Sequence, residues 1–335
     1  MKISFLLQNV FTSTFFWKRP SNYTRNLNVY DFNISNNITL LQNYDLPINY
    51  NTIQKCMLMS YYAYKQDTWS NWEKIMYNLT DDVSVGPNDI KAFLFSDKDK
   101  LHNIIAIKGT TLFDIFNSTV AHDKLNDNLF FSCCFYKQST LFKDYCIKEN
   151  NTQTDKYECK KSCYLNILNM DNYITMLPII IDNISKIIDF KTSNVYFTGH
   201  SLGGFLAVYL GLKYNKQVIT FDSPGEKHFL DLLNINYDKR DTSVYHFGHT
   251  ADSIMNGECG NLCKLVGYNI ETKCKIGNSC IYDSKKKLDI SNSILTHKLD
   301  YIIKYILPEW KNDFPLCYYN SNLSCKENCN KWLFK

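Results

Sequence analysis

The pentapeptide GHSLG at 199–203 constrains the fold of this chain more than any other feature. It follows a β-branched and aromatic run, 194–198, that predicts a buried strand, and it leads into 203–212, which predicts a helix. A G-x-S-x-G sequence between a strand and a helix makes a sharp turn that presents the serine hydroxyl, and its glycines leave room where Cβ atoms would collide. The alternative is an ordinary glycine-rich turn. The flanking strand and helix favour the nucleophile turn.

The rest of the chain predicts one large α/β domain. Apolar runs at 92–95 and 104–107 flank a polar turn and predict a hairpin. We expect further strands at 218–221 and 243–247, a cysteine-rich hairpin through Tyr282, and helices at 52–66, 165–190 (broken at Pro178) and 297–307. Strands and helices alternate without a linker or repeat, which indicates a single α/β domain over 21–335 with a mostly parallel sheet and flanking helices.

Three segments stand apart from this alternation. Residues 112–163 are polar and aperiodic, and an insertion of this length is typical of a lid or binding loop. Residues 308–335 form a cysteine-containing tail. The first twenty residues carry one early charge and a broken apolar stretch, which fits either a weak signal or anchor segment or an amphipathic arm.

Composition excludes some classes of function. The 335 residues are 45% hydrophobic and 21% charged, which is typical of a globular protein with a sizeable core. The net charge is only +4 with both signs interspersed, so the chain lacks the basic patch of a nucleic-acid-binding protein. It has no run of eighteen apolar residues, so the sequence predicts no clear membrane span.

Thirteen cysteines indicate an oxidising compartment, because clustered thiols in polar sequence are typical of disulfide-bonded proteins. A zinc site is the alternative, since C-x3-C occurs at 159/163, 259/263 and 325/329. No histidine lies close to these pairs, and zinc sites more often use other spacings. The odd total leaves one cysteine unpaired or paired between chains. Potential N-glycosylation acceptors are Asn22, Asn33, Asn37, Asn78, Asn117, Asn150, Asn183 and Asn322.

A serine nucleophile at Ser201 needs a histidine base, and that base needs an acid to fix its tautomer. In hydrolases of this architecture the chain order is serine, acid, histidine. His297 is the one histidine beyond an acid candidate at Asp252, so we predict His297 as the base and Asp252 as the acid. Asp222, at the end of the 218–221 strand, is the alternative acid; a simple turn residue is the favoured reading of that position.

The negative charge of a tetrahedral intermediate needs two N–H donors. The backbone of Leu202, fixed by the turn at the helix start, supplies one. Thr110, which follows the 104–107 strand and Gly109, is the expected second oxyanion-hole residue. This chemistry needs no metal or cofactor.

Together these residues resemble the class 3 lipase family, and within it the autophagy-related vacuolar branch. The resemblance spans about 52–307. It rests on the blocks IAIKGT (105–110, within 104–110), DKLNDNLFFSCC (123–134), TGHSLGG (198–204), TFDSPGE (220–226), HTADSIMNGEC (249–259), GYNIETKCKIGNSCIYD (267–283) and LTHKLD (295–300).

The resemblance implies an α/β-hydrolase fold and hydrolysis of ester bonds in phospholipids or acylglycerols. It implies Ser201, Asp252 and His297 as the triad, with Thr110 and Leu202 at the oxyanion positions. A lipid or membrane surface would be the substrate, with no obligate protein partner, in a vacuole-like or multivesicular lumen of the secretory pathway. The alternatives are a lipid-binding protein on an inactive hydrolase scaffold and a soluble esterase of small esters.

Overall fold

A computed structural model describes the chain in twelve stretches. They are residues 45–64, 78–82, 90–111, 120–135, 146–151, 156–169, 172–190, 192–237, 243–258, 263, 267–320 and 325–335. The segment 1–20 and parts of the predicted lid, 112–119, 136–145 and 152–155, lie outside these residues. The elements below all belong to one compact unit, 32–335. Among the described residues no helix combines the length and apolarity needed to cross a membrane.

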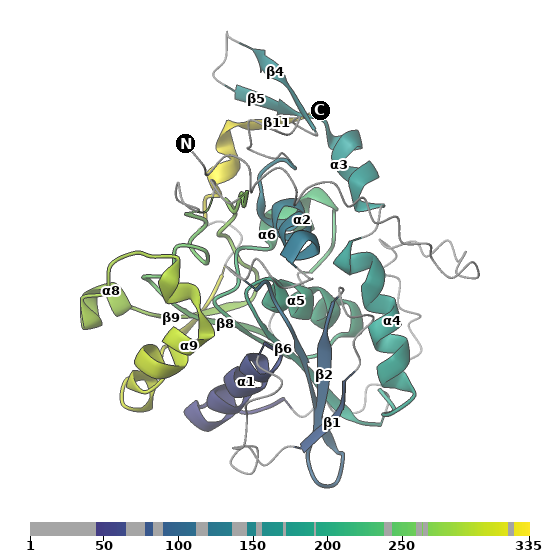
Figure 1. The fold of residues 1–335 in the computed structure, drawn as a ribbon, viewed down its shortest axis with the longest axis vertical. Helices are drawn as coiled ribbons and strands as arrows, with labels where there is room; N and C mark the ends of the chain where they lie inside the picture. The colour runs from purple at the N-terminus through teal and green to yellow at the C-terminus, as the bar shows by residue number, and fades with distance from the viewer. Residues whose placement is uncertain are drawn as a thin grey trace, which may run out of the picture. The chain divides into compact units, whose positions relative to one another are not determined.

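An eight-stranded sheet with the order β1-β2-β3-β6-β7-β8-β9-β10 dominates the described residues (Figure 1). Its strands are β1 (Asn78–Asp82), β2 (Ala92–Ser96), β3 (His102–Ile107), β6 (Asn194–His200), β7 (Val218–Phe221), β8 (Val244–His249), β9 (Asn278–Tyr282) and β10 (Cys317–Tyr319). The neighbours from β3 to β9 pair in parallel, and the outer pairs β1–β2, β2–β3 and β9–β10 are antiparallel. This mostly parallel sheet, with helices on its faces, is that of an α/β hydrolase.

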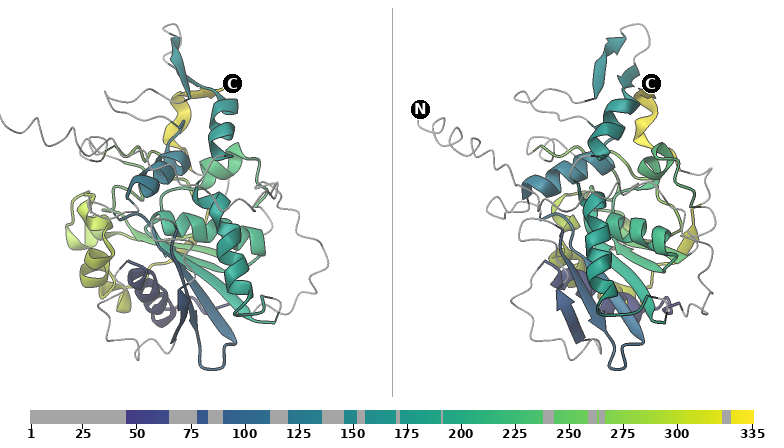
Figure 2. Two further views of the ribbon diagram at one scale, coloured as in Figure 1. Left: turned by 45° about the vertical axis from the view of Figure 1, so that its right-hand side comes forward. Right: turned by 90° about the vertical axis from the view of Figure 1, so that its right-hand side faces the viewer.

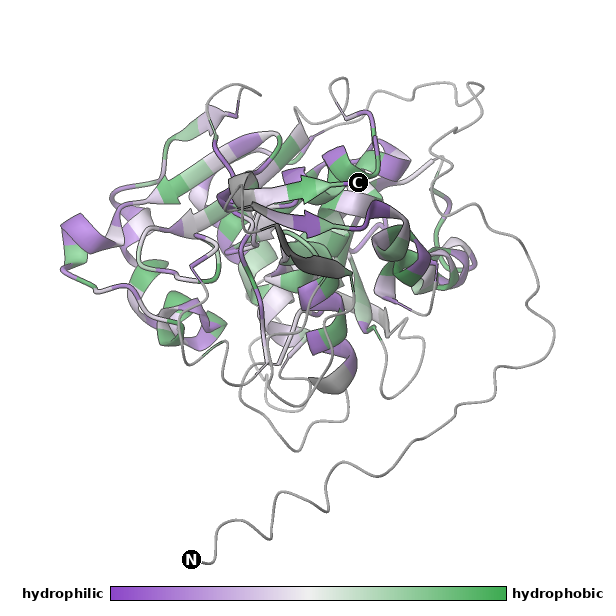
Figure 3. Cartoon of the chain, turned by 90° about the horizontal axis from the view of Figure 1, so that it is seen from above, coloured by the Kyte–Doolittle hydropathy of each residue, from purple (hydrophilic) through white to green (hydrophobic). Residues whose placement is uncertain are grey.

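Helices lie on both faces of the sheet and beyond its upper end in Figure 1. They are α1 (Tyr50–Tyr62), α2 (Val120–Phe131), α3 (Lys161–Leu168), α4 (Tyr173–Ser185), α5 (Leu202–Tyr214), α6 (Lys227–Leu232), α8 (Ser284–Leu288) and the short α9 (Leu299–Tyr301), which runs on into a π-helical turn, Ile302–Ile306. Every residue from Leu202 to Leu212 of α5 is buried, because this helix lies between the sheet and the neighbouring helices α2 and α4. Hydrophobic residues gather at the centre of the cartoon and hydrophilic ones at its margin (Figure 3).

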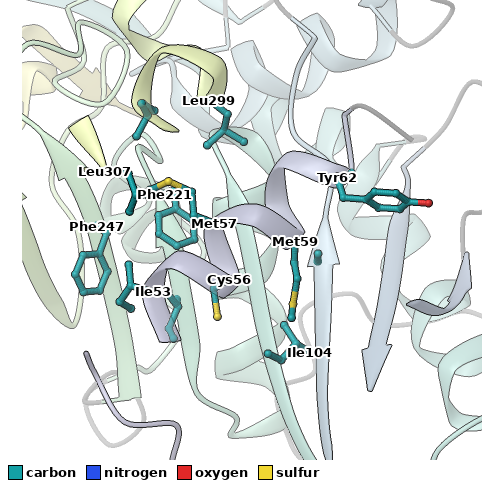
Figure 4. Close-up of a cluster of buried hydrophobic side chains, with 14 of the residues drawn as sticks. Ile53, Cys56, Met57, Met59, Tyr62, Ile104, Phe221, Phe247, Leu299 and Leu307 are labelled. Atoms are coloured by element: carbon teal, nitrogen blue, oxygen red, sulfur yellow. The ribbon is translucent and has the colours of Figure 1, made fainter. Parts of the chain in front are cut away.

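The opposite face of the sheet packs against α1 and the segment from α9 to Trp310. Ile53, Met57 and Met59 of α1 point toward the strands, where they meet side chains such as Phe221 and Phe247 (Figure 4). Trp310 is fully buried beside Phe247, with ring centroids 5.7 Å apart. Burying such aromatic and aliphatic groups stabilises the fold by roughly 1.5–3 kcal/mol each. This packing therefore stabilises the strands whose carboxyl ends lead into the candidate site.

A second, three-stranded sheet has the order β11-β5-β4. Its strands are β4 (Ile147–Asn151), β5 (Lys156–Cys159) and β11 (Trp332–Phe334). β5 is antiparallel to β4 and parallel to β11, so the C-terminal strand pairs with a segment more than 150 residues earlier. The two further views in Figure 2 show this small sheet at the end of the molecule away from the β2–β3 turn.

Five disulfides join described cysteines: Cys133–Cys329, Cys134–Cys159, Cys146–Cys163, Cys274–Cys325 and Cys280–Cys317. The predicted disulfide framework is thus present. The C-x3-C pairs at 159/163 and 325/329 send their two sulfurs to different partners, which rules out zinc ligation there. The free cysteine among the described residues is Cys56, buried in α1, where burial raises the pKa of its thiol to about 12.

Several local predictions need correction. Pro178 lies inside α4 rather than ending it; the helix break falls instead before Asn172, whose side chain caps α4 through a capping box with Thr175. Tyr282 ends a strand, β9, that is parallel to β8, so no hairpin joins them. The insertion 112–163 contains α2, β4, β5 and the start of α3 rather than only irregular chain, and the disulfides Cys134–Cys159 and Cys146–Cys163 link its parts. Its role as a lid stays a prediction.

Candidate active site

Ser201 lies at the sharp turn between β6 and α5. Its backbone has φ 57° and ψ −129°, a conformation that residues other than glycine rarely adopt. A hydrogen bond of 3.0 Å from the Ser201 N–H to the Phe221 carbonyl holds the turn against the end of β7. A strained backbone of this kind persists only where the surrounding structure requires it. Here it places the serine side chain at the carboxyl edge of the parallel strands.

The structure brings the three predicted triad residues together. His297 Nε2 lies 2.8 Å from Ser201 Oγ, and His297 Nδ1 lies 2.6 Å from Asp252 Oδ2. Asp252 follows β8, and His297 ends a 3₁₀ turn, Leu295–His297. Because a carboxylate accepts, Nδ1 carries the proton, which leaves Nε2 free to accept the proton of the serine hydroxyl. This is the geometry that a general base for Ser201 requires.

Asp252 is held in place by backbone donors. Its Oδ1 accepts hydrogen bonds from the N–H groups of Ile254, at 2.8 Å, and Met255, at 3.2 Å. Burial by itself would raise the pKa of Asp252, but the neighbouring His297 and these hydrogen bonds outweigh it and lower that pKa to about 2. The carboxyl group is therefore ionised at all ordinary pH values and can fix the imidazole.

The His200 side chain contacts the backbone of His297. Its Nε2 lies 2.8 Å from the backbone carbonyl of His297, and its Nδ1 lies 3.0 Å from the Tyr64 hydroxyl. Burial, then the nearby His297, lower the pKa of His200 well below its usual range. A neutral His200 thus donates from Nε2 to the carbonyl and accepts from Tyr64. No local pattern in the sequence indicated that this side chain contacts the loop of His297.

The loop after β3 packs directly against the turn of Ser201. A Cβ on Gly203 would lie 2.2 Å from the Ile107 carbonyl oxygen, and one on Gly109 would lie 2.2 Å from the His200 carbonyl oxygen. Only glycine allows this approach. Thr110 and Leu202 therefore come from neighbouring segments, and Leu202, as the first residue of α5, has an N–H group without an intrahelical acceptor.

Acidic groups of α2 support Thr110. The Thr110 hydroxyl donates to Asp127 Oδ2 over 2.5 Å, and Lys108 lies 3.7 Å from Asp123, with all four side chains buried. Burial raises the pKa of Asp127 well above its usual range, while the Thr110 hydrogen bond opposes that rise. Sequence reasoning missed Asp127. The signal available was the pair of acids one helical turn apart in the block 123–134.

Asp222, the alternative acid, lies beside the triad. It occupies the turn after β7 with φ 45°, is fully buried, and accepts the His249 N–H at Oδ1 over 3.2 Å. An oxygen of its carboxyl group lies within 4.8 Å of an oxygen of Asp252. Hence Asp222 is the turn residue that was expected, but it is also part of the buried site.

One group among the described residues has the spacing of metal ligands, because atoms of Asp222, His249 and Asp252 all lie within 4.8 Å of one another. Their lone pairs are largely engaged. Both oxygens of Asp252 accept N–H donors, and the His249 ring nitrogens face Ser284 Oγ at 3.0 Å and the Thr296 carbonyl at 3.2 Å. This donor set suits an internal hydrogen-bond network better than an ion.

Known proteins resemble this chain over most of its length. "Putative lipase ATG15" of Eremothecium gossypii is 32% identical over 280 residues, which cover 77% of this chain and 50% of the relative. The proteins of the same name from Scheffersomyces stipitis and Debaryomyces hansenii are 32% and 30% identical and cover 78% and 76% of this chain. The chain belongs to this lipase family. It spans about half the length of the curated relatives that it matches, or less. No family model matches the chain.

Solved lipase structures align with part of this chain. A Rhizomucor miehei lipase propeptide complex has a TM-score of 0.40 at 12% identity, covering 74% of this chain and 78% of that one. A triacylglycerol lipase from Penicillium expansum has a TM-score of 0.39 at 11% identity, covering 70% and 79%. The strand order and register of the sheet itself define the fold described above.

The blocks that carry the family resemblance meet at one edge of the large sheet. IAIKGT ends at the loop with Thr110, TGHSLGG contains Ser201, and HTADSIMNGEC contributes Asp252. TFDSPGE and LTHKLD contribute Asp222 and His297. All of these loops follow the carboxyl ends of parallel strands or return to them, which is where α/β proteins bind their ligands.

Proposed function

We propose that this chain is a serine lipase or phospholipase that hydrolyses carboxylic ester bonds, with Ser201 as nucleophile, His297 as general base and Asp252 as the acid that orients it. The supporting observation is the continuous hydrogen-bonded series from Ser201 Oγ through His297 to Asp252, with distances of 2.8 and 2.6 Å. A serine hydroxyl in this arrangement loses its proton as it attacks a carbonyl carbon.

The reaction proceeds in two halves. His297 Nε2 takes the proton of Ser201 Oγ as the oxygen attacks the ester carbonyl, and the N–H groups of Leu202 and Thr110 stabilise the oxyanion. The protonated His297 then gives its proton to the leaving alcohol or lysophospholipid, which leaves an acyl-serine. Water, deprotonated by His297, releases the fatty acid and restores the serine. No cofactor takes part.

The substrates we propose are phospholipids or acylglycerols of membranes delivered to a lytic compartment, as in autophagy. The lipase names of the relatives support this class of substrate. Exposed apolar side chains near the site also support it: Leu295, in the turn of His297, is 57% exposed, and Leu125 of α2 is exposed as well. The disulfide framework fits the oxidising lumen of the secretory pathway, including a vacuole-like organelle.

The decisive experiment compares the wild type with Ser201→Ala on vesicles of defined phospholipids and on emulsified acylglycerols. We expect release of fatty acid and lysophospholipid by the wild type, loss of both in the variant, and loss of labelling by a fluorophosphonate. Ser193→Ala is the matched control, since Ser193 precedes β6, at the opposite end of this strand from Ser201, and belongs to no N-glycosylation sequon.

Other outcomes identify the alternatives. Vesicle binding without any release of fatty acid by the wild type would indicate an inactive scaffold that binds lipid. Activity confined to short water-soluble esters, with no increase at a lipid interface, would indicate a soluble esterase. Hydrolysis that persists in Ser201→Ala would contradict the assigned nucleophile.

A further inference from the structure

Two buried carboxyl groups lie side by side behind the proposed base. Asp222 follows β7 and Asp252 follows β8, and both are fully buried. An oxygen of Asp222 lies within 4.8 Å of an oxygen of Asp252, and two carboxylates are acceptors only. Two carboxylates that are this close to each other, and buried away from water, would repel each other strongly if both were ionised. One of the two groups must therefore keep its proton.

The surrounding donors show which group is ionised. Asp252 receives three N–H donors, from Ile254, Met255 and the His297 ring. Asp222 receives only the His249 N–H, and its Oδ2 is buried without a donor among the described residues. Hydrogen bonds to a carboxylate favour its charged form, and their absence disfavours it. The proton thus belongs to Asp222.

We propose that Asp222 is a positioning residue whose protonated carboxyl group donates a hydrogen bond to Asp252, so that the two acids share one proton and one negative charge. The effect on catalysis rests on the proposed function, whereas the shared proton does not. The hydroxyl of Asp222 would supply a fourth donor to the acid that orients His297, and it would satisfy the oxygen that otherwise lacks a partner.

The other groups around the pair are compatible with a single negative charge. His249, on β8, has an Nε2 that lies 3.9 Å from Asp222 Oδ1 but also 3.2 Å from the Thr296 carbonyl, to which it donates as a neutral imidazole. Burial lowers the pKa of His249, which keeps the ring neutral. Among the described residues, Lys275, His297 and His200 also interact with the pair, and Glu226 and Glu327 interact with Lys275.

The direction of the Asp222 pKa shift agrees with a proton on this group. Burial, followed by the charge of Asp252, raises the pKa of Asp222 well above its usual range. Burial also lowers the pKa of Lys275, although its acidic neighbours oppose that shift, so this lysine does not force both acids to ionise. The two acids titrate as a pair and not as independent groups.

The shared proton has a consequence for the pH profile. A hydrogen bond from Asp222 withdraws charge from Asp252, which weakens its attraction for a protonated His297. The pH dependence of the reaction therefore reports whether Asp222 donates this hydrogen bond.

The first test uses infrared difference spectroscopy of the full chain. The spectrum of the wild type minus that of Asp222→Asn should contain the C=O stretch of a protonated carboxyl group near neutral pH. Asp300→Asn, which alters an exposed acid bonded to Tyr61, should give no such band. This readout does not need hydrolysis, so it remains informative even if Ser201 is not the nucleophile. The absence of the Asp222 band would overturn the proposal.

The second test measures the pH dependence of kcat/KM, or of fluorophosphonate labelling. Asp222→Asn keeps a donor in its NH2 group and should retain the acid limb of the wild type. Asp222→Ala removes the donor and should move that limb to higher pH, with about a tenfold loss on the acid side. An Asn variant as impaired as the Ala variant would show that an ionised Asp222 is needed, and an Ala variant with an unshifted profile would show a merely structural role. If the Ala variant does not fold, the Asn profile and the infrared band still decide.

Discussion

The two sheets of this protein are stabilised in different ways. The eight-stranded sheet is packed on one face against α1 and the α9–Trp310 segment, and one disulfide, Cys280–Cys317, joins its outer strands β9 and β10. The three-stranded sheet has strands of three to five residues, with three disulfides on or beside it: Cys133–Cys329, Cys134–Cys159 and Cys146–Cys163. A segment too small to bury a core of its own depends on covalent links instead.

The large sheet itself has two parts, a polar edge with the proposed reacting groups and an apolar core. The proposed reacting groups lie at the carboxyl edge of the large sheet, where buried polar groups replace the apolar packing found further along the same strands. Phe221 is in the apolar core, and the next residue, Asp222, is in the polar network. Apolar positions lose stability in proportion to the volume removed, whereas polar positions depend on each partner. Changes at the two sheets should therefore affect different measurements.

The largest effect should come from Asp252→Asn. The amide would keep the acceptor for the Ile254 N–H but would present its NH2 group to His297 Nδ1, which forces the proton onto Nε2 and removes the base. We expect kcat to fall by about 10⁴-fold with little change in the free energy of unfolding. Asp300→Asn is the control. A loss of less than tenfold would mean that Asp252 is not the orienting acid.

The next effect should be on stability at the large sheet. Trp310→Ala would empty a fully buried position beside Phe247 and lower the free energy of unfolding by roughly 3–5 kcal/mol. Tyr318→Ala, at a side chain that is 68% exposed, should change it by less than about 0.5 kcal/mol. Urea denaturation followed by tryptophan fluorescence and circular dichroism measures both. Equal effects at the two positions would contradict the apolar core described here.

Removing a disulfide should have a somewhat smaller effect. Replacing Cys133 and Cys329 together by Ala releases the C-terminal segment from the end of α2, and typical costs are about 2–4 kcal/mol. The double variant should lose stability while wild-type kcat is retained below its melting temperature. Matched removal of Cys280–Cys317 tests the large sheet. A greater loss from Cys280–Cys317 than from Cys133–Cys329 would reverse the comparison between the two sheets.

The smallest effect should be a change in how stability depends on pH. The pKa of Asp222 is raised in the folded state, so its contribution is fully present below about pH 3.8 and is lost as the pH rises through its folded value. Asp252, with its pKa lowered to about 2, contributes above pH 3.8 and loses that contribution as the pH falls toward 2. Asp222→Asn should therefore gain stability relative to the wild type as the pH rises. Parallel curves of unfolding free energy against pH would refute this.

Much of the site could be predicted because local sequence determines it. The turn of Ser201 needs a strand, two glycines and a helix in immediate succession, and all of them lie within about twenty residues. The order of serine, acid and histidine along the chain then selected Asp252 and His297. Alternating strands and helices likewise indicated the parallel sheet. Prediction was poorer at 112–163 and at Pro178, where disulfides and capping by Asn172 outweigh the local pattern.

The sequence by itself determined the strand–turn–helix of Ser201, the α/β class and the set of residues proposed to form a triad, because each depends on local pattern or chain order. Only the tertiary structure decided that Asp222 adjoins Asp252, that His200 supports the His297 loop, and that Asp127 holds Thr110. It also decided which cysteine, Cys56, is free. These contacts join residues 17 to 97 positions apart, and their energies depend on burial and on neighbouring charges that arise only when the strands align.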